Sequence, residues 1–270
     1  MGQHKFLILP VAIALGLSAF DTELVAATPY DYLKEFCALG ERVPGSSGHR
    51  QAMRYIATQL GKAEIDSFDH RGIRYFNLYR RYAGEGPTIG LGVHWDSYRG
   101  CPGANDGGSG VALLLKLADT LDRNPPRRPV HLLFFDGEDV NQAECLGSNH
   151  FASACVSQYS FILILDMVGD RELTIYKEGN SYQFFTTLVD SIWAIGAETA
   201  PDCFRSEVKY YITDDHIPLI KYGMRAIDII DFDYAPYWHT ADDTIDKCSA
   251  ESLDAIFRFL LSLMYGTGSE

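Results

Sequence analysis

The apolar residues of this chain are spaced in two ways, which predict a succession of helices and strands. Apolar residues at helical spacing predict helices over 29–40, 47–63, 107–123, 181–198 and 249–266, with Ser249 placed to cap the last. Short apolar runs predict strands over 88–94, 128–136, 161–169, 173–179 and 224–231. Because strands alternate with helices, we expect an α/β three-layer sandwich, with a mostly parallel central sheet and helices on both faces.

The N-terminus has the pattern of an export signal. Lys5 precedes an apolar run from Phe6 to Phe20, and the small residues 25–27 follow it. An uncleaved membrane anchor is the alternative, but the run is short for a full span and contains Pro10. We therefore expect residues 1–27 to be a signal peptide and the mature chain to be secreted or periplasmic.

No linker or repeat divides the rest of the chain, so we expect a single catalytic domain over residues 28–270, without stable membrane insertion. The net charge of −13 and the absence of any Lys/Arg-rich run argue against nucleic acid as a partner. An acidic chain favours cationic small substrates, such as free peptide amines. The six cysteines permit disulfides in an exported protein, with Cys145 and Cys155 as the closest pair, or are buried thiols.

Acids and histidines gather where the predicted strands end. They are His94, the pair Glu138–Asp139, Asp166, the run Asp214–Asp215–His216, and His239 in the loop after the last strand. Ligands of such sheets bind beyond the carboxyl ends of the strands. These residues therefore predict one shared site.

Several of these side chains carry the donor atoms that zinc prefers. The set is His94, Asp106, Asp139, Asp166 and His239. Asp106 lies in "GANDGGSG", where glycines let the backbone approach a metal closely. Taken singly, each could be an ordinary polar loop residue, and Asp106 a helix N-cap. Five together predict a metal site.

The adjacent acids Glu138 and Asp139 follow a buried strand directly, which is costly unless both are used. We interpret them as a metal ligand, Asp139, beside an unligated proton carrier, Glu138. The alternative is a solvated acidic turn, since "DGED" has turn composition.

Two further aspartates precede a histidine in "YYITDDHIPLI", at residues 210–220. One aspartate would be enough to cap the following helix, so Asp214 is a candidate for chemistry and a simple N-cap is the alternative. Asp215 and His216 are expected to orient the turn and start the helix.

Several segments resemble a known family. "GVHWDS", "GANDGGSGVALLLKLADTL", "LLFFDGED" and "YWHTADDT" resemble the zinc-dependent aminopeptidases with two co-catalytic zincs. Within that superfamily, "DDHIPLI", "YWHT" and the early "LGERVPGSSGH" are more similar to the glutaminyl-peptide cyclotransferases, or glutaminyl cyclases. The resemblance covers the chain from about residue 30 to its C-terminus.

The cyclase resemblance implies one zinc held by Asp106, Asp139 and His239. Glu138 would be the proton shuttle, Asp166 and Asp214 an acidic hydrogen-bonded pair, and Trp238 a pocket wall. The product would be an N-terminal pyroglutamyl peptide, formed from an N-terminal glutamine with release of ammonia. Animal cyclases carry a Trp shortly after the acid pair, and this chain has none there, so that wall is absent or is supplied from elsewhere.

The aminopeptidase resemblance implies two zincs, with His94 and Asp166 completing the second site. Asp106 would bridge the metals, Asp96 would orient His94 and Glu138 would activate water. Such enzymes usually have Ser where Asp214 stands, so Asp214 favours the cyclase. A non-catalytic binding module is the third alternative, but it would be expected to lose ligands or Glu138.

Overall fold

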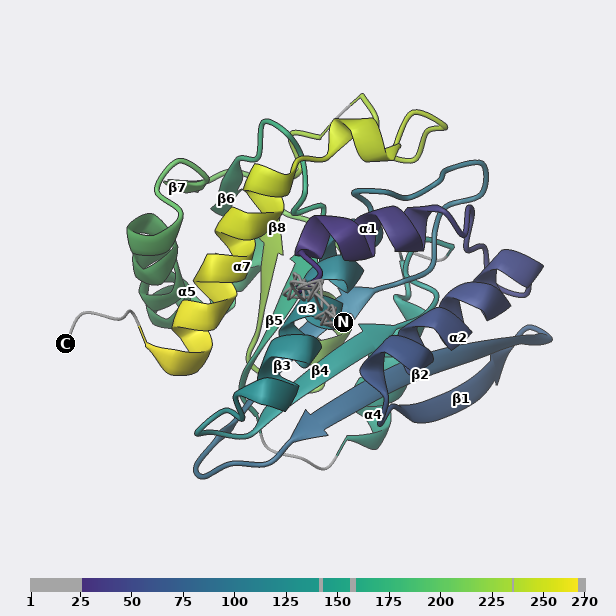
Figure 1. Ribbon diagram of the computed structural model, residues 1–270. Coiled ribbons are helices and arrows are strands. Elements are labelled where there is room, and N and C mark those ends of the chain that lie inside the picture. Colours follow the sequence, from purple (N-terminus) through teal and green to yellow (C-terminus); the bar gives the residue numbers. More distant parts are fainter. Residues whose placement is uncertain (1–25, 141–142, 156–158, 235, 267–270) are drawn as a thin grey trace, which may run out of the picture.

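The computed structural model describes residues 26–140, 143–155, 159–234 and 236–266, and its centre is a six-stranded sheet (Figure 1). In spatial order the strands are β1 (Glu64–His70), β2 (Ile73–Tyr82), β4 (Val130–Phe135), β3 (Thr88–His94), β5 (Tyr159–Asp166) and β8 (Ala226–Ile230). The last four run parallel, whereas β2 is antiparallel to both β1 and β4. The prediction of a mostly parallel sheet is therefore confirmed.

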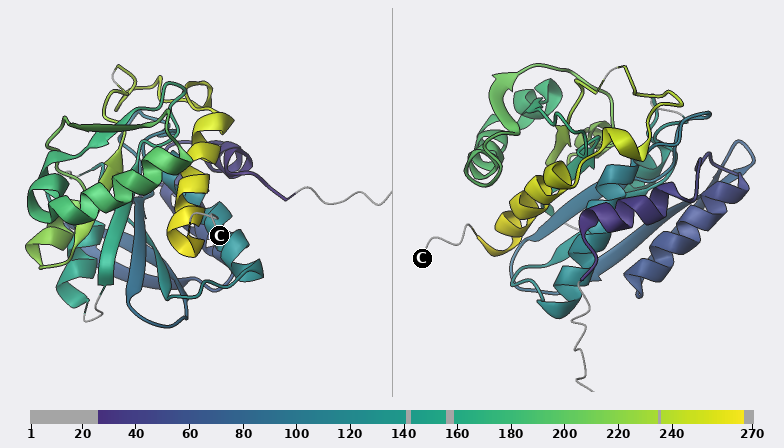
Figure 2. Two further views of the ribbon diagram at one scale, coloured as in Figure 1. Left: turned by 90° about the vertical axis from the view of Figure 1, so that its left-hand side faces the viewer. Right: turned by 45° about the horizontal axis from the view of Figure 1, so that its top comes forward.

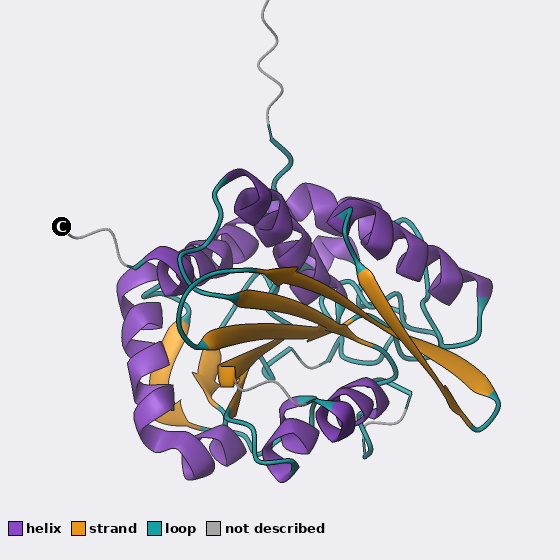
Figure 3. Cartoon of the chain, turned by 90° about the horizontal axis from the view of Figure 1, so that it is seen from below, coloured by secondary structure: helices purple, strands orange, loops and turns teal. Residues whose placement is uncertain are grey.

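Helices cover both faces of this sheet, which Figure 3 shows edge-on. One face carries α1 (Pro29–Cys37), α2 (Ser47–Leu60), α3 (Gly108–Arg123), α5 (Gly179–Thr199) and α7 (Ala250–Tyr265). The other carries α4 (Leu146–Ala154) and α6 (His216–Lys221). Along β5, Leu163 and Leu165 pack into the core on the face that carries α3. Ile162 and Ile164 pack into the core on the opposite face, which carries α4. This alternation explains why β5 is apolar throughout, and it confirms the three-layer sandwich.

The structure differs from the expected strands at two places. The segment 173–179 contains a short strand, β6 (Ile175–Lys177), but it pairs with β7 (Phe204–Val208) in a separate two-stranded sheet. This small sheet and α5 lie at the β8 end of the molecule (Figure 2). The hairpin of β1 and β2 was not predicted. β1 is a largely exposed edge strand whose sequence, EIDSFDH, lacks an apolar run, and β2, IRYFNLYRRY, is interrupted by polar residues.

A disulfide between Cys145 and Cys155 is ruled out by α4, which was not predicted. These residues lie just before and just after that nine-residue helix. At 1.5 Å per residue they are roughly 15 Å apart, far beyond the reach of a disulfide. The buried-thiol alternative holds for Cys101, Cys203 and Cys248, whereas Cys37 is a partly buried thiol.

The predicted signal peptide falls almost wholly outside the described residues. Within the described ranges, none of the helices combines the length and apolarity needed to cross a membrane. The folded part begins at α1, where Thr28 is the N-cap. Its hydroxyl oxygen accepts a hydrogen bond from the Asp31 backbone, and the Asp31 carboxylate accepts one from the Thr28 backbone.

Candidate metal and proton-transfer site

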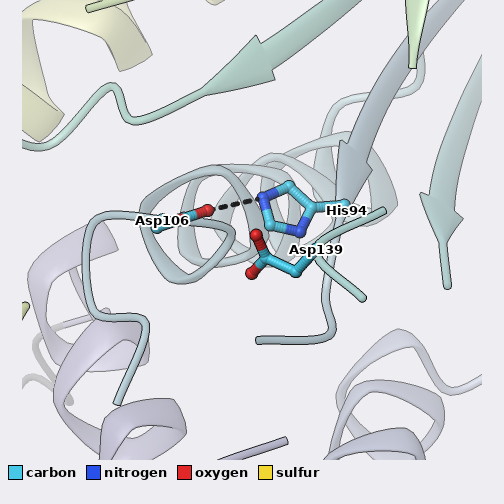
Figure 4. A group of neighbouring side chains, drawn as sticks. All are labelled: His94, Asp106 and Asp139. Atoms are coloured by element: carbon cyan, nitrogen blue, oxygen red, sulfur yellow. Dashed lines mark ion pairs between the residues drawn. The ribbon is translucent and has the colours of Figure 1, made fainter. Parts of the chain in front are cut away.

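The side chains at the carboxyl ends of the strands converge on one centre. His94 Nε2 lies 3.0 Å from Asp106 Oδ1, and these two residues approach Asp139 closely enough that one donor atom from each lies within 4.8 Å of the others (Figure 4). His239 Nε2 lies 2.8 Å from Asp139 Oδ1 and 3.4 Å from Asp106 Oδ2. Asp166 Oδ1 lies 3.2 Å from His94 Nε2. The structure thus brings together all five predicted candidates for zinc ligands.

The backbone is bent to make this convergence possible. His239 has φ 58°, a left-handed conformation that is uncommon outside glycine and is often found at functional sites. Gly107, with φ 72°, precedes α3, and a Cβ on it would lie 2.8 Å from the His94 ring. Only glycine therefore lets the entry to α3, with Asp106, approach His94.

Asp96 and Asp243 hold the site together through backbone groups. Asp96 Oδ1 accepts a hydrogen bond from the Glu138 backbone N at 3.1 Å and lies 3.6 Å from His94 Nδ1. Asp243 accepts hydrogen bonds from the backbone N of Asn105 and of Asp106, and from the Tyr234 hydroxyl at 2.7 Å. The position of Asp96 fits its expected orienting role. Asp243 was missed, although it lies in the quoted segment "YWHTADDT".

Arg42 was also missed, and it anchors the loop that carries the ligands. Its guanidinium is fully buried and donates to the carbonyls of Trp95, Pro102 and Gly103 at 2.7–2.8 Å, and to that of Asp106 at 3.3 Å. One side chain therefore ties together the segment from the end of β3 to Asp106.

Replacement of Arg42 by Met should destabilise this loop severely. Because several buried carbonyls would lose their donor, we expect a loss of about 3 kcal/mol of unfolding free energy and faster zinc release. Thermal unfolding and release of zinc to a chromogenic chelator measure the two effects. Arg50→Met is the matched control, since the exposed side chain of Arg50 donates to a single carbonyl among the described residues, that of Gly45. Equal effects of the two substitutions would show that Arg42 has no special role.

The donor set fits a cation. Asp106 and Asp139 are both buried, and Asp139 Oδ2 has no hydrogen-bond partner among the described residues. Burial, followed by the charge of Asp106, raises the pKa of Asp139 to about 7. Burial would also raise the pKa of Asp106, but hydrogen bonds from His239 and His94 lower it. Crowded buried carboxylates with unused oxygen atoms, beside imidazole nitrogens, are what a zinc ion requires.

Glu138 lies beside this centre but is only 5% exposed, which rules out the solvated acidic turn. Burial and then the charge of Asp214 raise the pKa of Glu138 well above its ordinary value. Burial and then the charge of Asp166 raise the pKa of Asp214 to about 6. These acids therefore form a row in which each disfavours ionisation of its neighbour, as expected for groups that exchange protons near neutral pH.

The N-cap alternative for Asp214 is not supported, because α6 begins at His216 and Asp215 occupies its N-cap position. His216, at the first position of α6, is buried, with Nε2 3.2 Å from Glu178 Oε2 and Nδ1 3.6 Å from Asp228 Oδ2. Glu178 and Asp228 were not anticipated. Their roles come from tertiary contacts to α6, which no local pattern in the sequence reveals.

A cavity of about 300 Å³ opens above these acids. Its acidic floor includes Asp106, Glu138, Asp139, Asp166 and Asp214. One side is apolar and contains Trp238, whose ring lies 4.2 Å from that of His239. Tyr210, Tyr211 and Phe232 continue this side. The aromatic residues of this side come from positions 210–211, 232 and 238, and not from the segment shortly after the acid pair.

Comparison with known proteins shows which family and which solved structures this chain is similar to. A model of Peptidase family M28 matches residues 77–264. The bovine glutaminyl-peptide cyclotransferase is 25% identical over 285 residues, covering 83% of this chain and 79% of that protein.

Solved structures with the same fold include both glutaminyl cyclases and aminopeptidases. The Tannerella forsythia glutaminyl cyclase superposes with a TM-score of 0.81 at 29% identity, covering 89% of this chain and 98% of the other. A leucine aminopeptidase precursor from Bacteroides thetaiotaomicron superposes with a TM-score of 0.82 at 27% identity, covering 89% and 96%.

Proposed function

We propose that this chain, which belongs to Peptidase family M28, is a zinc-dependent glutaminyl-peptide cyclotransferase that converts the N-terminal glutamine of peptides to pyroglutamate. The observation that carries the proposal is the row of buried acids. Asp214 lies in the cavity with Glu138 and raises its pKa, and Trp238 lines the same cavity. The similarity to glutaminyl cyclases over most of the chain supports it.

In the proposed reaction the chain moves one proton. Glu138 accepts a proton from the substrate α-amine as its nitrogen bonds to the side-chain amide carbon. When the bond from that carbon to the amide nitrogen breaks, Glu138 returns the proton and ammonia leaves. Asp214 and Asp166 share a proton and hold the departing nitrogen by hydrogen bonds. Trp238 forms an apolar wall against the glutamine side chain.

Zinc would be held by Asp106, Asp139 and His239, and when bound it supplies the Lewis acidity that polarises the amide carbonyl. We propose one zinc per chain. Burial would lower the pKa of His94, but hydrogen bonds with Asp106 and Asp166 raise it well above its ordinary value. With a single zinc, His94 Nε2 stays paired with Asp106 and Asp166 instead of binding a second metal.

The second candidate is a secreted di-zinc aminopeptidase that removes N-terminal residues from peptides. It is favoured by the position of His94 within reach of both Asp106 and Asp166, which gives a second set of ligands. However, an aminopeptidase would not explain why an aspartate stands at position 214.

Two substrates separate the candidates. The purified mature chain is given a glutaminyl peptide, followed by ammonia release and loss of ammonia mass, and a leucyl chromogenic amide, followed by cleavage. We expect ammonia release without amide cleavage, and about one zinc per chain by elemental mass spectrometry. Amide cleavage without cyclisation, with two zincs, would establish the aminopeptidase instead.

The proposed substrates are free peptide or protein N-termini met outside the cytoplasm. We propose that residues 1–27 direct export and are then removed. The capping box at Thr28 supports this boundary, since Thr28 itself caps the first turn of α1. Detection of a mature N-terminus at Thr28 in the exported protein tests it.

A further inference from the structure

The outer part of the cavity has a feature that the proposed reaction does not use. Tyr211 lines the cavity and is 68% exposed, more than the other large hydrophobic side chains exposed on the described surface. An exposed aromatic at the mouth of a pocket leaves apolar area for a ligand to cover.

Tyr211 is held firmly although it is exposed. Its ring lies on Gly179, where a Cβ would come within 2.5–2.6 Å of three ring atoms. The flanking backbone is tied to the start of α5 on both sides: Gly179 N donates to Tyr210 O at 2.6 Å, and Ile212 N donates to Glu178 Oε1 at 3.0 Å. The ring is therefore ordered before anything binds, which lowers the entropic cost of binding.

The aromatic wall runs from Trp238 through Phe232 to Tyr210, the residue before Tyr211 in the chain. The Trp238 and Phe232 rings are 5.1 Å apart, and the Phe232 and Tyr210 rings 5.3 Å apart, both edge-to-face. The nearby charges are already paired, because Lys209 Nζ lies 2.7 Å from Asp233 Oδ1 and above the Tyr210 ring. The wall thus offers apolar surface, and the described residues that line the cavity include no Lys or Arg to pair with an acidic side chain.

The geometry of cyclisation determines which part of the peptide contacts the aromatic wall. The α-amine and the side chain of the terminal glutamine are joined over the acidic floor. The third substituent of the same carbon, the carbonyl that leads to the second residue, must leave the new ring toward the mouth. The second residue therefore emerges where Tyr210, Tyr211 and Phe232 stand.

We infer that Tyr211, with Tyr210 and Phe232, forms a subsite for the side chain of the second residue of the peptide and selects large apolar or aromatic residues there. The inference rests on the proposed function for the orientation of the substrate. Acidic second residues are disfavoured, since they approach a floor of carboxyl groups and find Lys209 already paired.

The test is the ratio of kcat/KM for a Gln-Phe peptide to that for a Gln-Ala peptide. We expect a ratio of about 10 or more, as buried apolar groups of this size typically give. Tyr211→Ala should bring the ratio toward one. Gly179→Ala should do so as well, because it displaces the Tyr211 ring without removing any aromatic group. Tyr222→Ala, which removes a 53% exposed tyrosine away from the cavity, is the matched control and should leave the ratio unchanged.

A binding measurement separates this inference from the proposed function. Calorimetric affinities of the same two peptides for the Glu138→Gln variant do not depend on turnover. If the wild-type enzyme releases ammonia from neither peptide, but the variant binds Gln-Phe about 10 times more tightly than Gln-Ala, the reaction is wrong and the subsite stands. Equal affinities, or a ratio that Tyr211→Ala leaves intact, would overturn the subsite. Loss of self-association in Tyr211→Ala with an unchanged ratio would identify the wall as a contact between copies of the chain.

Discussion

Glu138→Gln should reduce kcat for cyclisation by about 10²–10⁴-fold, the usual contribution of a positioned proton carrier. Glutamine has nearly the same shape but cannot accept the proton from the attacking amine. The backbone N of residue 138 still donates to Asp96, so the turn that carries Asp139 should keep its geometry. The initial rate of ammonia release from a glutaminyl peptide measures the effect.

Two controls distinguish the loss of the proton carrier from a loss of zinc or a general effect of the substitution. Zinc content should be unchanged, because Glu138 is outside the proposed ligand set. Glu144→Gln is the matched control, since Glu144 is partly exposed and lies 3.9 Å from Arg71 on the surface. A Glu138→Gln variant with full zinc content and a kcat close to that of the wild type would remove Glu138 from the mechanism.

The location of the site could be predicted because it depends on a regular property of the fold. Parallel strands deliver their carboxyl ends to one edge, so the polar residues at the carboxyl ends of the strands predicted within 88–94, 128–136 and 161–169 had to meet. The apolar strands were recognisable because both their faces are buried. Glu138 and Asp139 could be recognised as a functional pair because an apolar strand leads directly into them.

The supports of the site could not be predicted, because they act through backbone groups and contacts distant in the chain. Arg42 binds carbonyls more than 50 residues away, and a lone arginine in a loop gives no sign of such bonds. Glu178 and Asp228 meet His216 only once α5, α6 and β8 have packed together. The strand β1 was not predicted for a different reason, since a solvated edge strand needs no apolar run.

Asp214→Asn should have two effects, which are expected only if Asp214, Asp166 and Glu138 act together in proton transfer. We expect kcat for cyclisation to fall by about 100-fold, because the amide cannot share a proton with Asp166 as a carboxyl group does. The acid limb of the kcat/KM profile should also move to lower pH. Glu138 works in its ionised form, and the negative charge of Asp214 raises its pKa. Removing that charge lowers the pKa of Glu138, so the base stays ionised at a more acidic pH.

Both effects can be separated from damage to the fold. Asn retains the side-chain oxygen that accepts the Asp215 backbone N–H, so the start of α6 should survive. Asp254→Asn removes one exposed carboxylate from α7 and controls for the change in net charge. An acid limb that does not move would show that Asp214 and Glu138 titrate independently. If leucyl amide cleavage were present and unaffected by Asp214→Asn, the acid would be dispensable and the aminopeptidase assignment would follow. If the acid limb of the kcat/KM profile shifts and cyclisation is reduced, Asp214 controls the proton that Glu138 holds.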